Sequence, residues 1–471
     1  MSSSVSTAQG ARSSHRWLAL TVLALAQFLV VLDASIVNIA LPSIGEQLGL
    51  DTTGLGWVIT AYVLPFGGLL LLGGRLADRY GHRRLFLIGT AGFVVASALA
   101  GLALTGEWLL IARALQGASA ALLAPASLAL LTQLFTTTAD RAKALGIWGA
   151  VAGIGSAAGV LLGGVLTGTF GWPSVFFVNL PIGIIVLAVI PILITRDARQ
   201  DRTRLDLAGA ATITLGLAAL VGAFASAEQN GFTHALTLGL AAAAVVLIAA
   251  FVVIEKRTAL PLVSFGIFRS RAVTAGNLAI LLAGAGMVGL FFALSVYMQA
   301  VLGYDALTAG LSQLPLAGAL VVVAGLSSPI VTRFGPRAVL IVSLLVFAGG
   351  LVWLAMAPSD AAFVAHLLGP TLVIGVGIGG VFIAGTQLAV DGVREEDSGL
   401  AGGLVNTAQQ VGGALGLAIL TTVAAARTAS LEQAGATAPE AMTGGLAWIF
   451  LGAAIAAVLA AAVVSIVRDR S

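Results

Sequence analysis

Cysteine is absent from this chain of 471 residues, and charged residues make up only 9% of it. Without cysteine the chain can form no disulfide, no thiolate metal site and no thiol nucleophile. Soluble domains carry about 25% charged residues, so a water-soluble fold of this composition would lack the polar surface to cover itself. The shortage of charge therefore excludes an ordinary soluble protein.

Lysine occurs only twice, at Lys143 and Lys256. Neither lysine follows the glycine-rich pattern of a phosphate-binding loop, so the sequence predicts no ATPase site of its own. We expect no cofactor.

Long apolar runs dominate what is present: 59% of the residues are hydrophobic, and the mean hydropathy is +1.06. Runs of this kind match the roughly 20 residues that a helix needs to span a bilayer, whereas the ~10-residue alternating segments of an outer-membrane barrel are not visible. The sequence predicts an all-α polytopic membrane protein with fourteen transmembrane helices. The spans are 17–41, 55–73, 85–105, 108–132, 144–168, 174–195, 205–226, 234–254, 272–300, 306–331, 338–357, 361–389, 398–424 and 444–467.

The basic residues orient these spans. With the N-terminus inside the cell, 21 of the 23 lysines and arginines fall in cytoplasmic loops or tails; Arg113 lies within a span and Arg427 lies outside. The positive-inside rule then predicts a multi-pass protein of the cytoplasmic membrane with both termini in the cytoplasm. This placement explains the net charge of +3 without a nucleic-acid partner.

The chain also repeats itself. The segment PIVTRFGPR (329–337) after the tenth span matches GRLADRYGHRR (74–84) after the second, and many secondary transporters are built from repeated halves. We expect two six-helix bundles and two extra helices. The predicted divisions are a tail at 1–16, a bundle at 17–195, a linker with the extra helices at 196–271, a bundle at 272–467 and a tail at 468–471.

Five motifs together resemble one family. LDASIVNIALP (32–42), GRLADRYGHRR (74–84), RALQG (113–117), GSAAGVLLGG (155–164) and NTAQQVGGALG (406–416) are similar to motifs of the major facilitator superfamily, and within it of the fourteen-helix drug:proton antiporters. The resemblance runs from the first helix to the last. It implies a multidrug efflux transporter of the facilitator fold that works by alternating access and is driven by a proton gradient.

Two positions depart from the family pattern. Val160 stands where the fifth-helix antiporter motif has proline, so any bend there must come from glycine or the helix stays straight. Gln409 stands where many members carry arginine in the thirteenth helix, which puts a charge-pairing role of that helix in doubt.

Asp33 is the clearest acid inside a predicted span. It lies roughly 24 Å along the first helix from Trp17, where an ionised carboxylate costs about 2.5–3.5 kcal/mol on insertion scales. Burial therefore favours its protonated form, and entry of water favours release of the proton. We expect Asp33 to bind proton or substrate but not both; the alternative is a structural hydrogen bond to a neighbouring helix.

Arg113 is the other deep charge and needs a buried partner. Asp33 is a candidate, which would give both residues a role in proton coupling. The alternative is that Arg113 bonds backbone carbonyls or forms a polar cluster with Gln116.

The 74–84 loop is predicted to act as a conformational clasp. Gly74 permits close helix approach and Gly81 a tight turn, and Asp78 can cap a helix or pair with Arg79 and Arg83. Simple topogenic charge would explain the arginines but not Asp78.

Glycines mark a possible sliding seam in the fifth helix. Gly155, Gly159 and Gly163 are four residues apart, Gly164 follows, and such spacing allows close packing. We expect this seam between the halves, with static packing as the alternative.

A substrate cavity is expected near the middle of the membrane. In the thirteenth helix Asn406, Gln409 and Gln410 share one stripe, and they would line the cavity or bond between helices. The other candidates are Gln27, Trp57, Tyr62, Trp148, Asn277 and Tyr297.

The sequence thus predicts a proton-coupled antiporter that exports lipophilic drugs or amphiphilic metabolites as a monomer in the lipid bilayer, and not an enzyme. A facilitator-fold carrier of a lipid or endogenous metabolite and a proton-linked importer are the alternatives. A membrane enzyme would need an interfacial cluster of carboxylates or histidines, and the long loop 427–443 offers two glutamates and no histidine. We predict no metal site.

Overall fold

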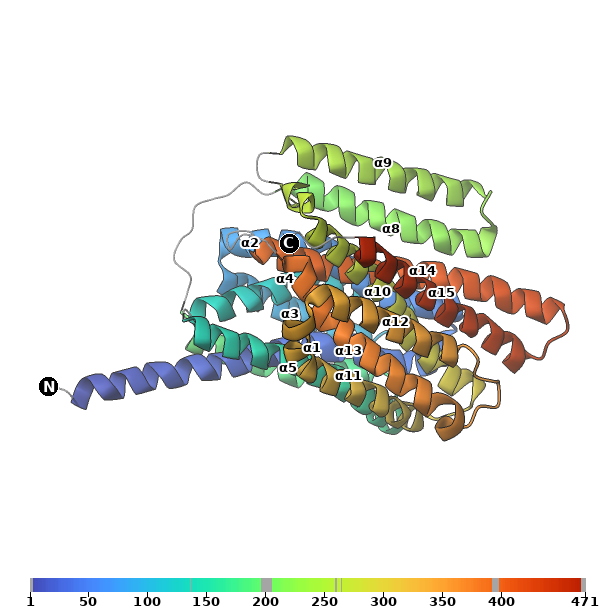
Figure 1. The fold of residues 1–471 in the computed structure, drawn as a ribbon, viewed down its shortest axis with the longest axis horizontal. Coiled ribbons are helices and arrows are strands. Elements are labelled where there is room, and N and C mark those ends of the chain that lie inside the picture. The colour runs from blue at the N-terminus through green and yellow to red at the C-terminus, as the bar shows by residue number, and fades with distance from the viewer. Residues whose placement is uncertain are drawn as a thin grey trace.

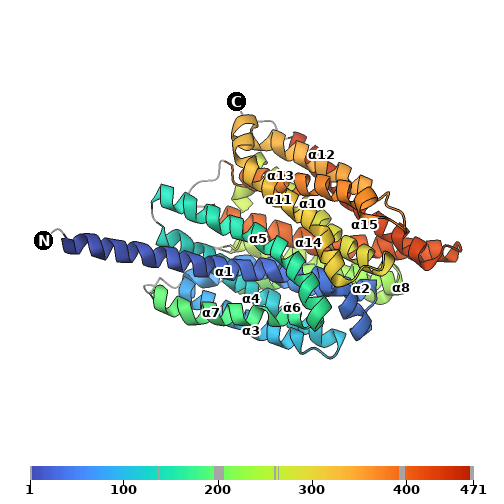
Figure 2. The same cartoon turned by 90° about the horizontal axis from the view of Figure 1, so that it is seen from below.

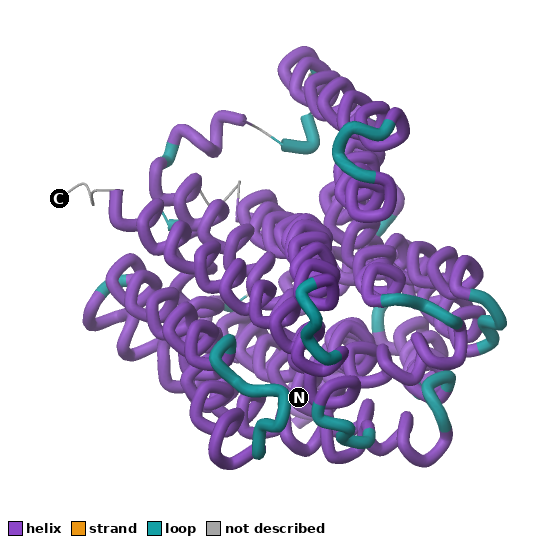
Figure 3. The backbone as a smooth tube through the Cα atoms, turned by 90° about the vertical axis from the view of Figure 1, so that its right-hand side faces the viewer, coloured by secondary structure: helices purple, strands orange, loops and turns teal. Residues whose placement is uncertain are grey.

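The computed structural model describes residues 3–135, 137–195, 206–258, 261–263, 265–391 and 398–466, without some helical side chains such as that of Trp148. Within these ranges all regular elements are helical and no strand occurs (Figures 1 and 3). The predicted residues 196–205 of the linker and the tail 468–471 lie outside the described residues.

Seven helical segments form the N-terminal half. They are α1 (Ser3–Leu48), α2 (Thr52–Tyr80), α3 (His82–Gly101), α4 (Gly106–Leu134), α5 (Thr138–Phe170), α6 (Ser174–Phe177) and α7 (Asn179–Leu193). The short α6 and the longer α7 together make up the predicted sixth span. They break at Val178, where Pro181 has no N–H to donate to the carbonyl of Phe177.

An extra hairpin and a C-terminal half follow. The hairpin consists of α8 (Leu207–Asn230) and α9 (Ala235–Arg257), and the short η1 (Phe265–Arg269) leads on from it. The C-terminal half contains α10 (Arg271–Val296), η2 (Tyr297–Val301), α11 (Ala306–Phe334), α12 (Pro336–Leu354), η3 (Phe363–Leu367), α13 (Leu368–Val390), α14 (Ser398–Gln433) and α15 (Ala438–Ile466).

Thirteen stretches of the described helices are long and apolar enough to cross a membrane. The remaining predicted span, 144–168, lies in α5, whose described apolar part is Ala158–Phe170. α5 is one uninterrupted helix through Val160, as the missing proline allows. The chain is therefore a polytopic α-helical membrane protein: thirteen of the predicted spans coincide with these stretches, and the fourteenth lies in α5.

Helices of the two halves pack in the same pattern. α1 packs on α5 as α10 packs on α14, and α2 packs on α4 as α11 packs on α13. Gly81 after α2 and Gly335 after α11 both have positive φ, of 97° and 80°, which glycine adopts without steric cost. The two loops that resemble each other in sequence thus adopt the same kind of turn.

Glycine brings helices of one half into backbone contact. A side chain on Gly117 of α4 would collide with the backbone of Tyr62 in α2, and one on Gly412 of α14 would collide with Leu281 in α10. Small residues at such crossings are typical of helices that pack within membranes.

The halves meet through α2 with α14 and through α5 with α11 (Figure 2). The extra hairpin lies along one side of the molecule (Figure 1), where α8 packs on α2 and α14 and carries α9 on its outer side. Since successive helices run in opposite directions, the molecule has two ends. We call the end with the Gly81 and Gly335 turns proximal and the end with Leu48 distal.

Candidate functional site

A buried ion pair lies within the N-terminal half. Oδ2 of Asp33, in α1, accepts a hydrogen bond from Nη1 of Arg113, in α4, over 2.6 Å. Asp33 is 0% exposed and Arg113 1%. The two deep charges that the sequence suggested as partners are therefore in direct contact.

The second carboxylate oxygen of Asp33 is bonded by two amides. Nε2 of Gln116 donates to Oδ1 over 2.7 Å and Nδ2 of Asn179 over 2.8 Å. Both amides also donate to Oγ of Ser97 in α3, and Oε1 of Gln116 accepts from Arg113. Helices α1, α3, α4 and α7 thus meet in one network, which we call the Asp33 cluster: Asp33, Ser97, Arg113, Gln116 and Asn179.

Aromatic rings and a backbone carbonyl complete the surroundings of Arg113. Its guanidinium carbon lies 4.3 Å from the ring centroid of Tyr62 and 5.8 Å from that of Phe176, within the range of cation–π attraction. Its Nε donates to the carbonyl of Val58 over 3.1 Å. Tyr62 is fully buried in this position, so it belongs to the wall of the cluster. We had expected it to line an open cavity.

Local sequence accounts for this arrangement. Arg113 and Gln116 are three residues apart on α4 and therefore share one helix face. Asn179 is the first residue of α7, at the break caused by Pro181. Gly117 removes the side chain that would hold α2 away from α4, which lets Val58 and Tyr62 reach the guanidinium.

Asp33 and Arg113 each compensate the charge of the other, because both are buried. Removing one partner of a buried pair leaves an uncompensated charge, which costs about 3–5 kcal/mol. A proton that neutralises Asp33 has the same effect on Arg113 unless water or another group enters. No group of three or more His, Asp or Glu residues among the described residues could hold a metal ion.

The predicted clasp lies at the proximal end. Gly81 makes the turn, and Nη2 of Arg83 donates to the carbonyl of Pro191 in α7 over 3.0 Å. Asp78 contacts Nε2 of His82 over 3.1 Å, and Nδ1 of His82 faces Nε2 of Gln133 in α4 over 3.1 Å. Asp78 thereby joins the ends of α2, α3 and α4 through a histidine that the sequence analysis did not consider.

The other clasp residues differ in their surroundings. The guanidinium of Arg79 lies over the ring of Tyr80, 5.3 Å from its centroid. Gly74 is not at a tight crossing, since an added Cβ would come no closer than 3.9 Å to Pro125. The expectation that Gly74 permits close helix approach is therefore wrong in this structure.

The distal ends of the two halves are in contact. Oγ of Ser295 in α10 donates to the carbonyl of Asn38 in α1 over 2.5 Å, and Nε2 of Gln299 donates to that of Ile39 over 2.9 Å. In α11, a Cβ on Gly310 would lie 2.7 Å from the carbonyl oxygen of Val160. These contacts hold the halves together on the distal side.

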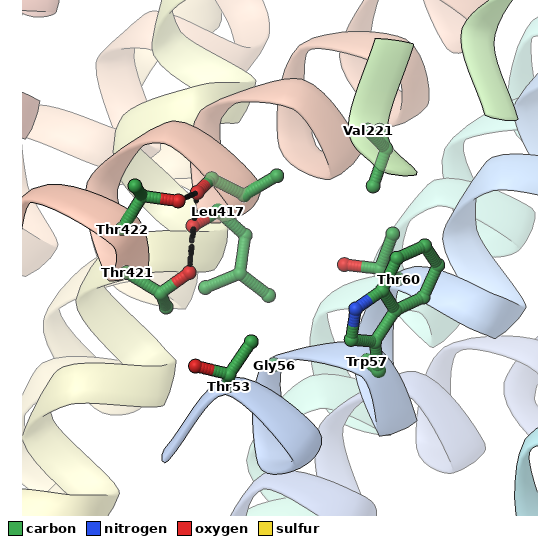
Figure 4. A pocket seen from close by; sticks show the side chains of 9 residues that line it. Thr53, Gly56, Trp57, Thr60, Val221, Leu417, Thr421 and Thr422 are labelled. Atoms are coloured by element: carbon green, nitrogen blue, oxygen red, sulfur yellow. Dashed lines mark hydrogen bonds between the residues drawn. The ribbon is translucent and has the colours of Figure 1, made fainter. Parts of the chain in front are cut away.

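A small pocket lies between α2, α8 and α14 (Figure 4). Its volume is about 10 Å³, which is room for about one water molecule. Thr421 and Thr422 face it with hydroxyls that donate to carbonyls of their own helix. A wider hollow of about 490 Å³ lies at the proximal end between α11, α12 and α13 and contains none of the predicted cavity residues.

Residues 23–417 match the profile of the Major Facilitator Superfamily. The chain belongs to this superfamily. This match confirms the resemblance that the sequence motifs indicated.

Named relatives of the superfamily extend over nearly the whole chain. The puromycin resistance protein pur8 of Streptomyces alboniger is 42% identical over 92% of this chain and 86% of its own. The cephamycin export protein CmcT of Amycolatopsis lactamdurans is 42% identical over 90% of this chain and 88% of its own. Both names describe transport or resistance and neither describes an enzyme, which fits the expectation of a non-enzyme.

A solved structure confirms the fold. An auto-inhibited peptide transporter of the POT family matches with a TM-score of 0.70, covering 97% of this chain and 98% of its own at 16% identity. The facilitator fold predicted from the sequence is therefore correct.

The glycine seam of this superfamily member differs from the prediction. Added Cβ atoms on Gly155, Gly159 and Gly163 would meet α1 of the same half; at Gly159 the distance to Cβ of Ser35 is 2.6 Å. Only Gly164 faces the other half, where its Cβ would lie 2.7 Å from the carbonyl oxygen of Ala306. The three-glycine stripe serves static packing within the half, because side chains of α1 fill its groove.

Two of the predicted cavity residues lie where the halves meet. Trp57 lines the pocket of Figure 4, and Gln410 packs on Gly67 of α2, whose added Cβ would lie 2.6 Å from that of Gln410. Gln409 instead turns its backbone to Gly284 of α10, within the C-terminal half. Nδ2 of Asn406 donates to the carbonyl of Gly402 in its own helix.

The remaining candidates are dispersed. Gln27 is half-buried, and its Oε1 has no hydrogen-bond partner among the described residues. Asn277 donates to the carbonyl of Val273 within α10, and the hydroxyl of Tyr297 donates to that of Pro358 near the distal end. Trp148 lies outside the described side chains.

Sequence reasoning missed three polar residues: Ser97, Asn179 and His82. Each is a polar residue within or beside an apolar span, which is expensive in a membrane unless it has a partner. A search for all such residues, and not for charges alone, would have found them.

Proposed function

We propose that this protein is a proton-coupled antiporter that exports lipophilic or amphiphilic antibiotics across the cytoplasmic membrane. Proton coupling is supported by the buried ion pair of Asp33 and Arg113 inside the N-terminal half. The named relatives, which are a resistance protein and an export protein for antibiotics, support the cargo class.

The cluster gives the cycle its proton site. The carboxyl group of Asp33 accepts hydrogen bonds from Arg113, Gln116 and Asn179. Protonation weakens these bonds and frees Arg113 to find other partners, so the proton favours a different packing of α1 against α4. Proton binding and helix rearrangement are thereby one event.

The contacts between the halves give the cycle its gate. Ser295 and Gln299 hold α10 to α1 at the distal end, which we assign to the outside of the cell from the positive-inside rule. The proximal end, with both termini, faces the cytoplasm. Export requires the distal contacts to open after cargo has entered from the proximal side.

The substrate site lies between the halves, where Trp57 and Gln410 are placed. Both halves are contained in one chain, so a monomer is sufficient. The extra hairpin touches this region through α8 but is separate from the Asp33 cluster.

Transport by purified protein in liposomes tests the proposal. With a proton gradient of either sign imposed, puromycin and a panel of neutral, cationic and zwitterionic amphiphiles are offered on one side. We expect cargo to accumulate on the side from which protons leave through the protein, and collapse of the gradient by a protonophore to stop accumulation. Cargo movement in the same direction as protons would indicate an importer, and no response to the gradient would contradict proton coupling.

A further inference from the structure

A second pair of buried acids lies outside the Asp33 cluster, at the proximal end of the extra hairpin. Asp206 precedes α8 and is 7% exposed, and Glu255 near the end of α9 is 3% exposed. Each carboxylate binds one backbone N–H: Oδ1 of Asp206 accepts from Gly209 over 2.7 Å, and Oε2 of Glu255 accepts from Val263 over 2.9 Å.

The other two oxygens both lie beside Gly209. A Cβ placed on Gly209 would lie 2.7 Å from Oδ2 of Asp206 and 2.7 Å from Oε1 of Glu255. Neither oxygen has a hydrogen-bond partner among the described residues. Two acceptor oxygens thus lie on the same side of Gly209, and the part of the chain that the structure describes offers neither of them a donor.

Among the described residues, no ion pair involves either of these two carboxylates. Lys256 and Arg257, next along α9, are exposed, and Arg75 of α2 points its Nη2 at the carbonyl of Pro261, 2.9 Å away. Two adjacent buried carboxylates oppose each other's ionisation unless a cation lies beside them.

We propose that Asp206 and Glu255 form a proton-binding site in which one shared proton joins these two oxygens. The shared proton would give both oxygens a partner at once, as an O–H···O⁻ bond. This site is distinct from Asp33, and the proposal does not depend on the identity of the exported compound.

The site is placed to latch the hairpin to the rest of the protein. Glu255 holds Val263, and Arg75 holds Pro261 two residues earlier, so the strap 261–263 is tied to α9 and to α2. Leu262 and Val263 pack in a small apolar cluster with Leu71 of α2 and Leu404 of α14. A Cβ on Gly403 of α14 would lie 2.9 Å from Leu71, which places the strap beside a contact between the halves.

Loss of the shared proton would therefore loosen the strap at the proximal end. With a shared proton, the folded protein would hold one more proton here near neutral pH than the unfolded chain, in which both carboxyls are ionised. The contribution to stability would then be present at low pH and fall as pH rises. A rise in pH on the proximal side would loosen the tie between α9 and α2 that the strap makes, while α8 stays packed on α2 and α14.

Amide substitutions test the shared proton. In Glu255→Gln the new amide can accept from Val263 and donate to Asp206, and in Asp206→Asn it can accept from Gly209 and donate to Glu255. Each single amide imitates the protonated pair at every pH. In the double variant two NH₂ groups face each other, so the bond is lost.

Two measurements on the purified protein test for the shared proton. The first is the thermal unfolding midpoint at about pH 5 and about pH 8, on either side of the range in which a buried acid pair titrates. The second is the distance between spin labels at Tyr80→Cys on α2 and Val253→Cys on α9, two half-exposed positions in a chain without native cysteine.

We expect the unfolding midpoint of the wild type to be lower at the higher pH. A second, longer distance between the spin labels should also appear there. In each single variant, the unfolding midpoint and the distance between the labels should be the same at pH 5 and at pH 8. The double variant should show the lower midpoint and the longer distance at both pH values. If the unfolding midpoint of the single variants falls as much as that of the double variant, the proposal is overturned. So would a wild-type midpoint that rises with Ca²⁺ or Mg²⁺ and falls with a chelator, since a cation and not a proton would then fill the site.

Discussion

Asp33 of α1 and Arg113 of α4 are 80 residues apart in the chain, yet their side chains meet over 2.6 Å in the interior of the N-terminal half. Each is the other's only charged partner among the described residues. The consequences of changing either residue therefore depend on whether the other is still present.

Asparagine at position 33 should leave Arg113 as a buried, uncompensated charge. We expect Asp33→Asn to lower the stability of the purified protein by about 3–5 kcal/mol. Arg113→Gln in the same chain should restore much of this loss because no buried charge then remains. Thermal unfolding of the two single variants and the double variant measures the coupling; additive losses would show that the contact carries little energy.

Asn179 should contribute to the same network through one charged hydrogen bond. We expect Asn179→Ala to cost about 1.5–3 kcal/mol, as is typical of bonds to charged groups. Asn277→Ala is the matched control, since this buried amide donates only to its own helix. Equal losses in the two variants, measured by thermal unfolding, would argue against a bond from Asn179 to an ionised Asp33.

Gly159 should not tolerate a side chain, because its Cβ would lie 2.6 Å from that of Ser35. We expect Gly159→Ala to destabilise the protein by about 1–3 kcal/mol through overpacking. Gly168 on the same helix has only ordinary contacts, with Cβ of Leu307 at 3.9 Å, so Gly168→Ala should be nearly neutral. Size-exclusion profiles after heating compare the two; a tolerated Gly159→Ala would show that α1 and α5 are less tightly packed.

The distal end can be locked closed by an engineered disulfide. The distance of 3.9 Å between an added Cβ at Gly168 and that of Leu307 suits a disulfide, and the chain has no cysteine of its own. We expect Gly168→Cys with Leu307→Cys to abolish transport when oxidised and to regain it with a reductant.

A cross-link within one half provides the control. Gly413→Cys and Val288→Cys both lie in the C-terminal half, at a Cβ distance of 3.6 Å, and their disulfide should leave transport active. Transport that survives the oxidised 168–307 link would show that α5 and α11 need not separate.

Much of the fold could be predicted because a membrane imposes strong rules. Apolar length revealed the spans, and the repeated loops of Gly81 and Gly335 pointed to two similar halves. The orientation inferred from the arginines stays a prediction. The pairing of Asp33 with Arg113 followed from the need of each deep charge for a partner. These inferences use the solvent alone and need no knowledge of which helices touch.

Side-chain direction could not be predicted in the same way. The stripe of Gly155, Gly159 and Gly163 shows that a helix packs closely, but it does not say on which neighbour, and that neighbour is α1. Asn179, which bonds Asp33, is the first residue of α7, and the break before α7 could not be located from the apolar run of the sixth span. Tyr62 could have faced a cavity or a charge, and the position of Arg113 decided between them.

Coupling at Asp33 is most directly tested by comparing two kinds of transport in liposomes that contain the Asp33→Asn protein. Exchange of labelled for unlabelled puromycin needs alternating access but no net proton movement, whereas accumulation against a gradient needs the proton. We predict that the variant retains exchange and loses proton-driven accumulation. Accumulation at the wild-type level would contradict the assignment of Asp33 as the proton site.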